Sequence, residues 1–131
     1  MGRDKIYPSE FTTEIKANAE KIVEKVNSLL AVMEAEGVPL EVHPQTLSLV
    51  SSGWRPPQIN QQVKNAAVRS KHMTGQAVDL YDPEGALDFF CLEGQASLAI
   101  IGLWMEHPVA TKGWAHLQSV APRSGSRVFY P

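Results

Sequence analysis

Two histidines and one aspartate are the residues of this chain whose types and spacing best suit a catalytic metal ion. His72 and Asp79 lie on either side of a Thr74-Gly75 turn, and His116 follows far downstream. Two imidazoles and a carboxylate form a ligand set suited to a catalytic zinc ion, which keeps a fourth position open for water. The pattern therefore predicts one zinc ion with these three ligands, and hydrolytic chemistry.

Two strands are expected to position these ligands. Gly75 tolerates backbone angles that other residues resist, so the chain can reverse after His72 and enter a strand at residues 76–80. Side chains alternate along a strand, which separates Asp79 from its apolar neighbours. Residues 114–118 alternate in the same way and would present His116 from an adjacent strand. We expect either Ser70 or a backbone carbonyl to hold the second nitrogen of a liganding histidine.

Three segments resemble the motifs of one enzyme family. Residues 70–79, S-K-H-M-T-G-Q-A-V-D, resemble the S-x-H-x-x-G-x-A-x-D signature of the zinc D-Ala-D-Ala carboxypeptidase and peptidoglycan endopeptidase family. Residues 114–116, W-A-H, resemble its closing motif, and residues 51–55, S-S-G-W-R, resemble its S-G-[YW]-R stretch. The matches run in the right order from about Ser51 to the C-terminus.

The resemblance implies a fold, a substrate and several site residues. It implies a hedgehog/DD-peptidase fold, and cleavage of peptides in bacterial cell-wall peptidoglycan, as in some phage lysis enzymes. Zinc would lower the pKa of its bound water towards about 7 and polarise the scissile carbonyl. Arg55 would bind a substrate carboxylate with two parallel hydrogen bonds. Ser70 is a further candidate for substrate binding, and Trp114 is expected to be part core and part pocket wall.

The usual proton-transfer residue of this family is missing here. Many relatives have an acidic residue three positions before the last histidine or a histidine two before it, where this chain has Gly113 and Trp114. Glu106, expected at the end of an apolar helix, is the nearest upstream carboxylate and is our candidate for the general base. The nearby alternatives are His107, Asp82 and Glu84.

Two other functions are compatible with the sequence. The first is a zinc-containing but catalytically impaired module that binds peptides or the cell wall, as the missing acid would allow. The second is a metal hydrolase that acts on a different substrate. Carboxypeptidase and endopeptidase activity are also not separated by the sequence, because the carboxylate that Arg55 binds can be terminal or internal.

Composition gives no sign of nucleic-acid or membrane binding. The 131 residues include 12 basic and 14 acidic residues, for a net charge of -2. The N-terminus lacks an apolar signal core, and no apolar run approaches membrane-spanning length. We expect a monomer made in the cytoplasm that reaches the wall through a phage lysis pore or in a virion. Cys91, within an apolar stretch, is expected to be a buried structural thiol.

The order of expected elements indicates an α+β fold with a small antiparallel sheet flanked by helices. One helix should run from Thr12 or Thr13 to Glu36, with Gly37 and Pro39 ending it. Further expected elements are a strand at residues 47–51, a short helix opening at 56–57 and reaching Val63, a turn at 82–85, a helical stretch at 86–105 interrupted near 93–94, and a last strand at 127–129. Without a linker or repeat, residues 1–131 are expected to form a single zinc peptidase domain.

Overall fold

The longest helix, α2 (Thr13–Ala35), begins and ends where the sequence predicts. The computed structural model describes residues 2–64, 66–67 and 69–131. The hydroxyl of Thr12 accepts a hydrogen bond from the amide nitrogen of Ile15 at 3.2 Å and so caps the first turn. Gly37 follows the helix with a φ of 75°, a left-handed conformation typical of helix ends. The buried face of α2 consists of Ile22, Val26, Leu29 and Met33.

A five-stranded mixed sheet carries the rest of the fold, which is α+β. Its strands, in spatial order, are β1 (Val50–Ser52), β2 (Ala77–Tyr81), β4 (Trp114–Gln118), β3 (Trp104–Glu106) and β5 (Val128–Phe129). All neighbouring pairs are antiparallel except β3 and β5, which run parallel. The prediction of a purely antiparallel sheet was therefore wrong for one pair. Because β4 occupies one edge of β3, the chain that follows β4 must cross to the other edge, where β5 pairs in the parallel direction.

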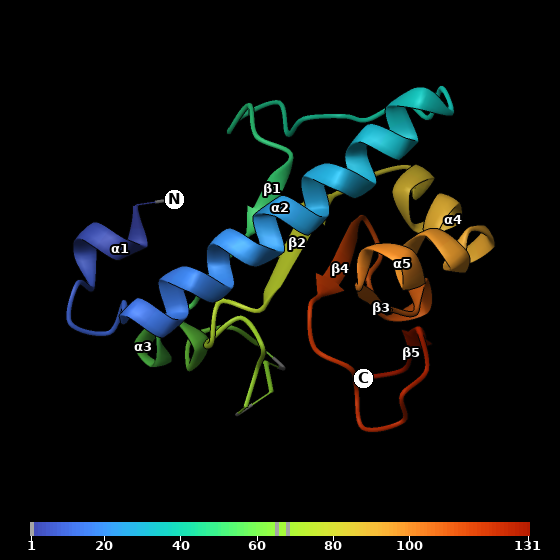
Figure 1. The fold of residues 1–131 in the computed structure, drawn as a ribbon. Coiled ribbons are helices and arrows are strands. Elements are labelled where there is room, and N and C mark those ends of the chain that lie inside the picture. Colours follow the sequence, from blue (N-terminus) through green and yellow to red (C-terminus); the bar gives the residue numbers. More distant parts are fainter. Residues whose placement is uncertain (1, 65, 68) are drawn as a thin grey trace.

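The core lies between this sheet and the helices on one face of it. Figure 1 shows α2 crossing in front of β1 and β2, with α5 (Gln95–Ile101) beside β3 and β4. Val78 and Leu80 of β2 and Leu117 of β4 are buried in this core. Because side chains alternate along a strand, Asp79 and His116 belong to the opposite face. The core thus fixes which face of the sheet carries the candidate ligands.

The region expected to be one interrupted helix contains two helices and a strand. The interruption is confirmed, since α4 (Ala86–Glu93) and α5 are separated at Gly94. The helical prediction was wrong at its end, where Trp104 and Met105 pair with β4 as part of β3. Gly102, with a φ of 90°, ends α5, and the free edge of β4 then supplies backbone partners. Glu106 consequently ends a strand rather than a helix.

The shorter elements also deviate from their predicted ranges. The strand expected at 47–51 is shifted to Val50–Ser52, because Leu47 has a φ of 55° that no strand accommodates. Helix α3 (Pro57–Asn60) ends before Val63, and a short helix α1 (Arg3–Ile6) and a 3₁₀ turn η1 (Pro108–Ala110) complete the elements. The turn at 82–85 is confirmed by a hydrogen bond from the Gly85 amide to the Asp82 carbonyl at 3.1 Å. Across the described residues, no helix combines the length and apolar character needed to cross a membrane.

Candidate metal centre

Asp79 and His116 face each other across two paired strands. They are direct partners in the antiparallel register of β2 and β4, as the alternation in the sequence predicts. The Nδ1 atom of His116 lies 3.0 Å from the Oδ1 atom of Asp79. Opposite residues of an antiparallel pair have neighbouring Cβ atoms, so the strand register alone brings these two side chains together.

A tight turn brings His72 to the same carboxylate. The Gly75 amide donates to the His72 carbonyl at 3.3 Å, and Gly75 itself has a φ of 74°. A Cβ atom at this position would lie only 2.8 Å from the carbonyl oxygen of Ile15 in α2, so both the backbone angle and the packing require glycine. Within this turn geometry, His72 Nε2 lies 3.1 Å from Asp79 Oδ1. All three predicted ligands are therefore adjacent, and each is largely buried.

The outer nitrogen of each histidine is held by an oxygen acceptor. His72 Nδ1 lies 2.8 Å from the carbonyl oxygen of Gly53, which can only accept, so this nitrogen carries a proton. His116 Nε2 lies 2.9 Å from Gln118 Oε1. The Gln118 amide nitrogen donates to the Val120 carbonyl at 2.7 Å, and this bond fixes the side-chain oxygen towards the histidine. The His116 Nε2 atom is therefore also a donor.

With both outer nitrogens protonated, the neutral rings direct their lone pairs at Asp79. Two lone pairs and a carboxylate oxygen repel one another unless protons or a cation lie between them. In the absence of a cation, the Asp79 carboxylate favours the protonated form of His116. Burial lowers the pKa of His116, but the hydrogen bond that its ring donates to the Asp79 carboxylate outweighs burial, and the pKa is raised. Burial alone would raise the pKa of Asp79. The hydrogen bonds that its carboxylate accepts from His116 and then His72 outweigh burial and lower this pKa to about 2.

This donor set fits a divalent cation. Two imidazole nitrogens and one carboxylate oxygen, each with the lone pair turned inward, form a chemically suitable site for zinc. Bond lengths of about 2.0–2.2 Å around a tetrahedral ion would place the ligand atoms about 3.3–3.5 Å apart. The observed separations of 3.0 and 3.1 Å from Asp79 Oδ1 require only a small expansion. The buried His72, Asp79 and His116 group could therefore hold a metal ion.

The segment 53–55 is connected to the His72 turn through backbone hydrogen bonds. The Arg55 amide donates to the His72 carbonyl at 2.9 Å, and the Trp54 indole nitrogen donates to the Met73 carbonyl at 3.1 Å. Together with the Gly53 carbonyl on His72 Nδ1, these bonds fix the position of the segment relative to the ligand. Any distortion of this segment would move the His72 ring.

Arg55 lies in this segment as a buried guanidinium. It is 8% exposed, and burial lowers its pKa. Its buried Nε atom has no hydrogen-bond partner among the residues that the structure describes. Its Nη2 atom donates to the hydroxyl of Ser70 at 3.3 Å. The same hydroxyl accepts from the His72 amide at 3.2 Å. Ser70 therefore orients Arg55 and the backbone at His72. Of the two groups expected to hold the second nitrogen of a liganding histidine, the backbone carbonyl, that of Gly53, is the one in contact with His72.

A cleft of about 530 Å³ opens beside the three candidate ligands. Its walls include the predicted site residues Arg55, Ser70, Glu106 and Trp114. The volume lies within the range of about 300–1,000 Å³ that is typical of sites for small ligands. The Oε1 atom of Glu106 lies 3.9 Å from His116 Nε2, the ring nitrogen that faces away from Asp79. The geometry brings all seven predicted site residues together, while their roles in binding and catalysis stay predictions.

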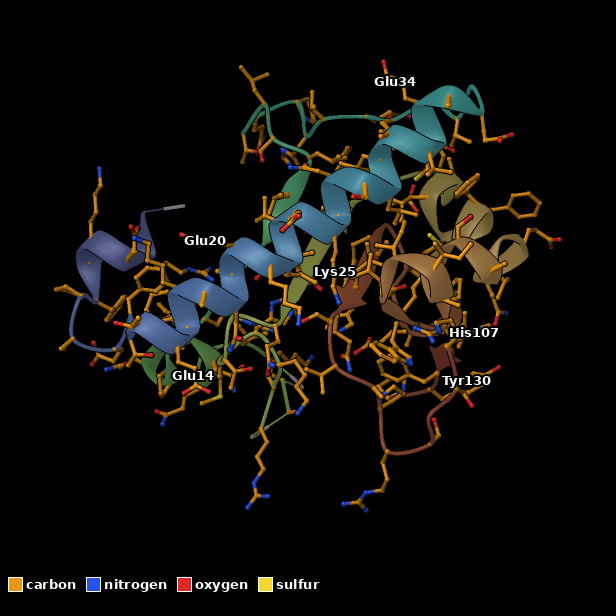
Figure 2. All side chains as sticks on the ribbon, viewed as in Figure 1. Glu14, Glu20, Lys25, Glu34, His107 and Tyr130 are labelled. Carbon is orange, nitrogen blue, oxygen red and sulfur yellow. The ribbon has the colours of Figure 1, made fainter. Side chains whose placement is uncertain are left out.

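The alternative proton-transfer residues occupy other positions. His107 stacks on Tyr130 with ring centroids 4.6 Å apart (Figure 2), and its Nδ1 atom accepts from the Val109 amide. Asp82 is buried, and both of its carboxylate oxygens accept backbone amides at the start of α4. Glu84 lines a smaller cavity elsewhere. Cys91 is fully buried, and burial raises the pKa of its thiol to about 12, which suits a structural role.

Two contributors to the site were missed in the sequence. A backbone carbonyl on a ligand nitrogen was one of the two alternatives expected, but nothing in the sequence identified it as that of Gly53, because every residue carries a carbonyl oxygen. Gln118 did have a signal, since it lies two positions after His116 on the same strand and therefore shares its face. Comparison of the chain with protein-family models, curated proteins and solved structures found no match.

Proposed function

We propose that this protein is a zinc-dependent peptidase that cleaves peptide bonds in bacterial cell-wall peptidoglycan. The observation that carries the proposal is the convergence of two histidine lone pairs and the Asp79 carboxylate at the cleft, with both outer nitrogens held by acceptors. The resemblance of residues 51–55, 70–79 and 114–116 to peptidoglycan peptidases supplies the substrate class. We extend the proposal to a hedgehog/DD-peptidase type of fold, since all three motifs lie on or beside the neighbouring strands β1, β2 and β4.

The metal would be held by His72 Nε2, Asp79 and His116 Nδ1. Zinc, when bound, supplies a Lewis acid for the scissile carbonyl and lowers the pKa of water. Arg55, oriented by Ser70, binds a carboxylate of the substrate through its planar guanidinium. Trp114 contributes an aromatic wall that excludes water from the cleft. Glu106 accepts a proton from the attacking water at its carboxylate and returns it to the leaving amine.

A second candidate, a metal-containing binding module without turnover, is favoured by one observation. Glu106 approaches the outer nitrogen of His116 rather than the nitrogen that faces Asp79. In this position the carboxylate can support the ring of a ligand without acting on the substrate. Gly113 and Trp114, at the positions where relatives of the resembled family place an acid or a histidine, provide no base.

Metal analysis combined with digestion of purified peptidoglycan tests the proposal. We expect one zinc per chain, lost in His72→Ala, Asp79→Ala and His116→Ala and retained in the control His43→Ala, whose ring lies outside the cleft. Mass spectrometry of the digest should identify peptide fragments and the bond that is cut. Zinc at one per chain without any released fragment would favour the binding module, and full zinc occupancy in His116→Ala would reject the site.

A further inference from the structure

The cleft is positively charged although the protein is acidic. The chain has a net charge of -2, but four cationic side chains line the cleft, against only two carboxylates among its described lining residues. Both carboxylates, Asp79 and Glu106, lie beside His116. One of the four cations is Arg55. The other three, Lys64, Arg69 and Lys71, form a second group that we call the cationic rim. A metal ion at the candidate centre would add further positive charge.

Two described residues in the part of the chain that carries the cationic rim, Ala67 and Lys71, are anchored to the fold. The buried side chain of Asn60 donates to the Ala67 carbonyl at 2.9 Å. The Lys71 carbonyl accepts from the Gln76 amide at 2.9 Å and from the Thr74 hydroxyl at 3.1 Å. These bonds tie Ala67 to α3 and Lys71 to the turn that follows His72, so two described residues on either side of Arg69 are fixed beside the cleft.

Arg55 provides a second, independent indication of an anionic ligand. A guanidinium that is 8% exposed normally pairs with a carboxylate, because burial of an uncompensated charge is costly. Among the described residues, no carboxylate lies within 4.0 Å of Arg55, and its Nε atom has no partner. The missing partner is therefore expected to come from a ligand in the cleft.

We propose that the cleft selects an acidic peptide with at least two carboxylates, one bound by Arg55 and a second by the cationic rim of Lys64, Arg69 and Lys71. This inference rests on the proposed peptidase function and names its substrate class more narrowly. The cleft lining also includes uncharged side chains that suit a peptide, among them Trp114, Pro122 and Phe129. A nucleic acid fits less well, since four cations confined to one cleft in an acidic chain give little contact with a phosphate backbone.

A matched pair of peptides tests the second carboxylate. The probes are N-acetyl-L-Ala-γ-D-Glu-L-Ala-D-Ala and the same peptide with the D-Glu α-carboxylate amidated, so that both keep the terminal carboxylate. Calorimetry on the zinc-loaded and the zinc-free protein should give a Kd about 3- to 10-fold lower for the acid than for the amide at about 0.05 M salt. The difference should shrink at about 0.5 M salt, where exposed charges are screened.

Variants of the cationic rim test whether these side chains cause the difference in Kd between the two peptides. Lys64→Gln combined with Arg69→Gln should remove most of the difference between the two peptides, because only Lys71 of the rim remains. The matched control Lys16→Gln, an exposed lysine on α2, should keep the full difference. Equal affinity of the wild type for the two peptides would overturn the inference, as would equally tight binding of a short oligonucleotide.

The failure of this inference is distinguishable from that of the peptidase proposal. Binding is measured without turnover in the zinc-free protein, so a preference for the acid can be established even if neither peptide is cleaved. Discrimination without cleavage would refute the peptidase and support the inference. Cleavage of wall peptides with equal affinity for both probes would support the peptidase and refute the inference.

Discussion

Replacing Gln118 by methionine should weaken zinc binding although Gln118 is not a proposed ligand. In the wild type, the Gln118 oxygen holds the proton of neutral His116 on Nε2, 2.9 Å away, and leaves the Nδ1 lone pair free. Methionine has a similar length and no comparable acceptor. In Gln118→Met the proton can move to Nδ1, where it donates to Asp79 across 3.0 Å. A metal ion would then have to displace this hydrogen bond before it could bind.

The expected loss of zinc affinity follows from the hydrogen bond between His116 Nδ1 and Asp79 that the metal-free Gln118→Met protein gains. A hydrogen bond to a charged group contributes about 1.5–3 kcal/mol, and every 1.4 kcal/mol is a factor of ten in affinity. We therefore expect the Kd for zinc to rise about 10- to 100-fold, which is the usual effect of losing a group that orients a metal ligand. Glu106, 3.9 Å from the same nitrogen, is the group best placed to replace the lost acceptor. Addition of Glu106→Leu should therefore bring the loss towards the upper end of this range.

Competition with a chromophoric chelator measures the zinc affinity, and far-ultraviolet circular dichroism checks the fold. The matched control is Gln95→Met, because Gln95 is an exposed glutamine whose side chain donates to the Leu92 carbonyl at 3.3 Å. Nitrogen NMR of the histidine rings reports the tautomer of His116 directly. A folded Gln118→Met protein that binds zinc within about twofold of the wild type would refute this account of the site.

Three further predictions concern catalysis, substrate binding and pH. Glu106→Gln should retain zinc and lower kcat by about 10²-fold or more if Glu106 is the general base; an unchanged kcat would move proton transfer elsewhere. Arg55→Lys should keep the fold and zinc but lower kcat/KM, since lysine retains the charge without the planar fork; wild-type kcat/KM would assign Arg55 to structure. Burial, and then the Asp82 carboxylate, raise the pKa of Asp88 from 3.8 to about 7, so the folded state holds a proton that the unfolded state releases. The free energy of unfolding should therefore fall as pH rises between these values, and Asp88→Asn should remove about 2–3 kcal/mol of the fall between about pH 5 and 8. Denaturant titrations of both proteins at each pH test this, and identical pH profiles would contradict it.

The elements with strong local patterns were predictable from the sequence. Thr12 marks the start of α2 and Gly37 its end. Both signals are local, because a capping hydroxyl and a glycine in the left-handed conformation act within one turn of the chain. The alternation along residues 76–80 and 114–118 predicted two adjacent strands with Asp79 and His116 on a shared face, and β2 and β4 confirm it. Their convergence with His72 also followed from the sequence, because Gly75 marks the turn that reverses the chain between two ligands.

Tertiary structure decided the features that depend on contacts between distant segments. Trp104 and Met105 belong to the apolar stretch that predicted a helix, yet they form a strand because β4 offers an unpaired edge, and this partner is not visible in local periodicity. The same holds for the Gly53 carbonyl on His72 and for the burial of Arg55, which arise when residues 53–55 pack against a turn almost twenty positions later. Spacing could identify the ligand types, but the proton positions that prepare them for a metal depend on these long-range hydrogen bonds.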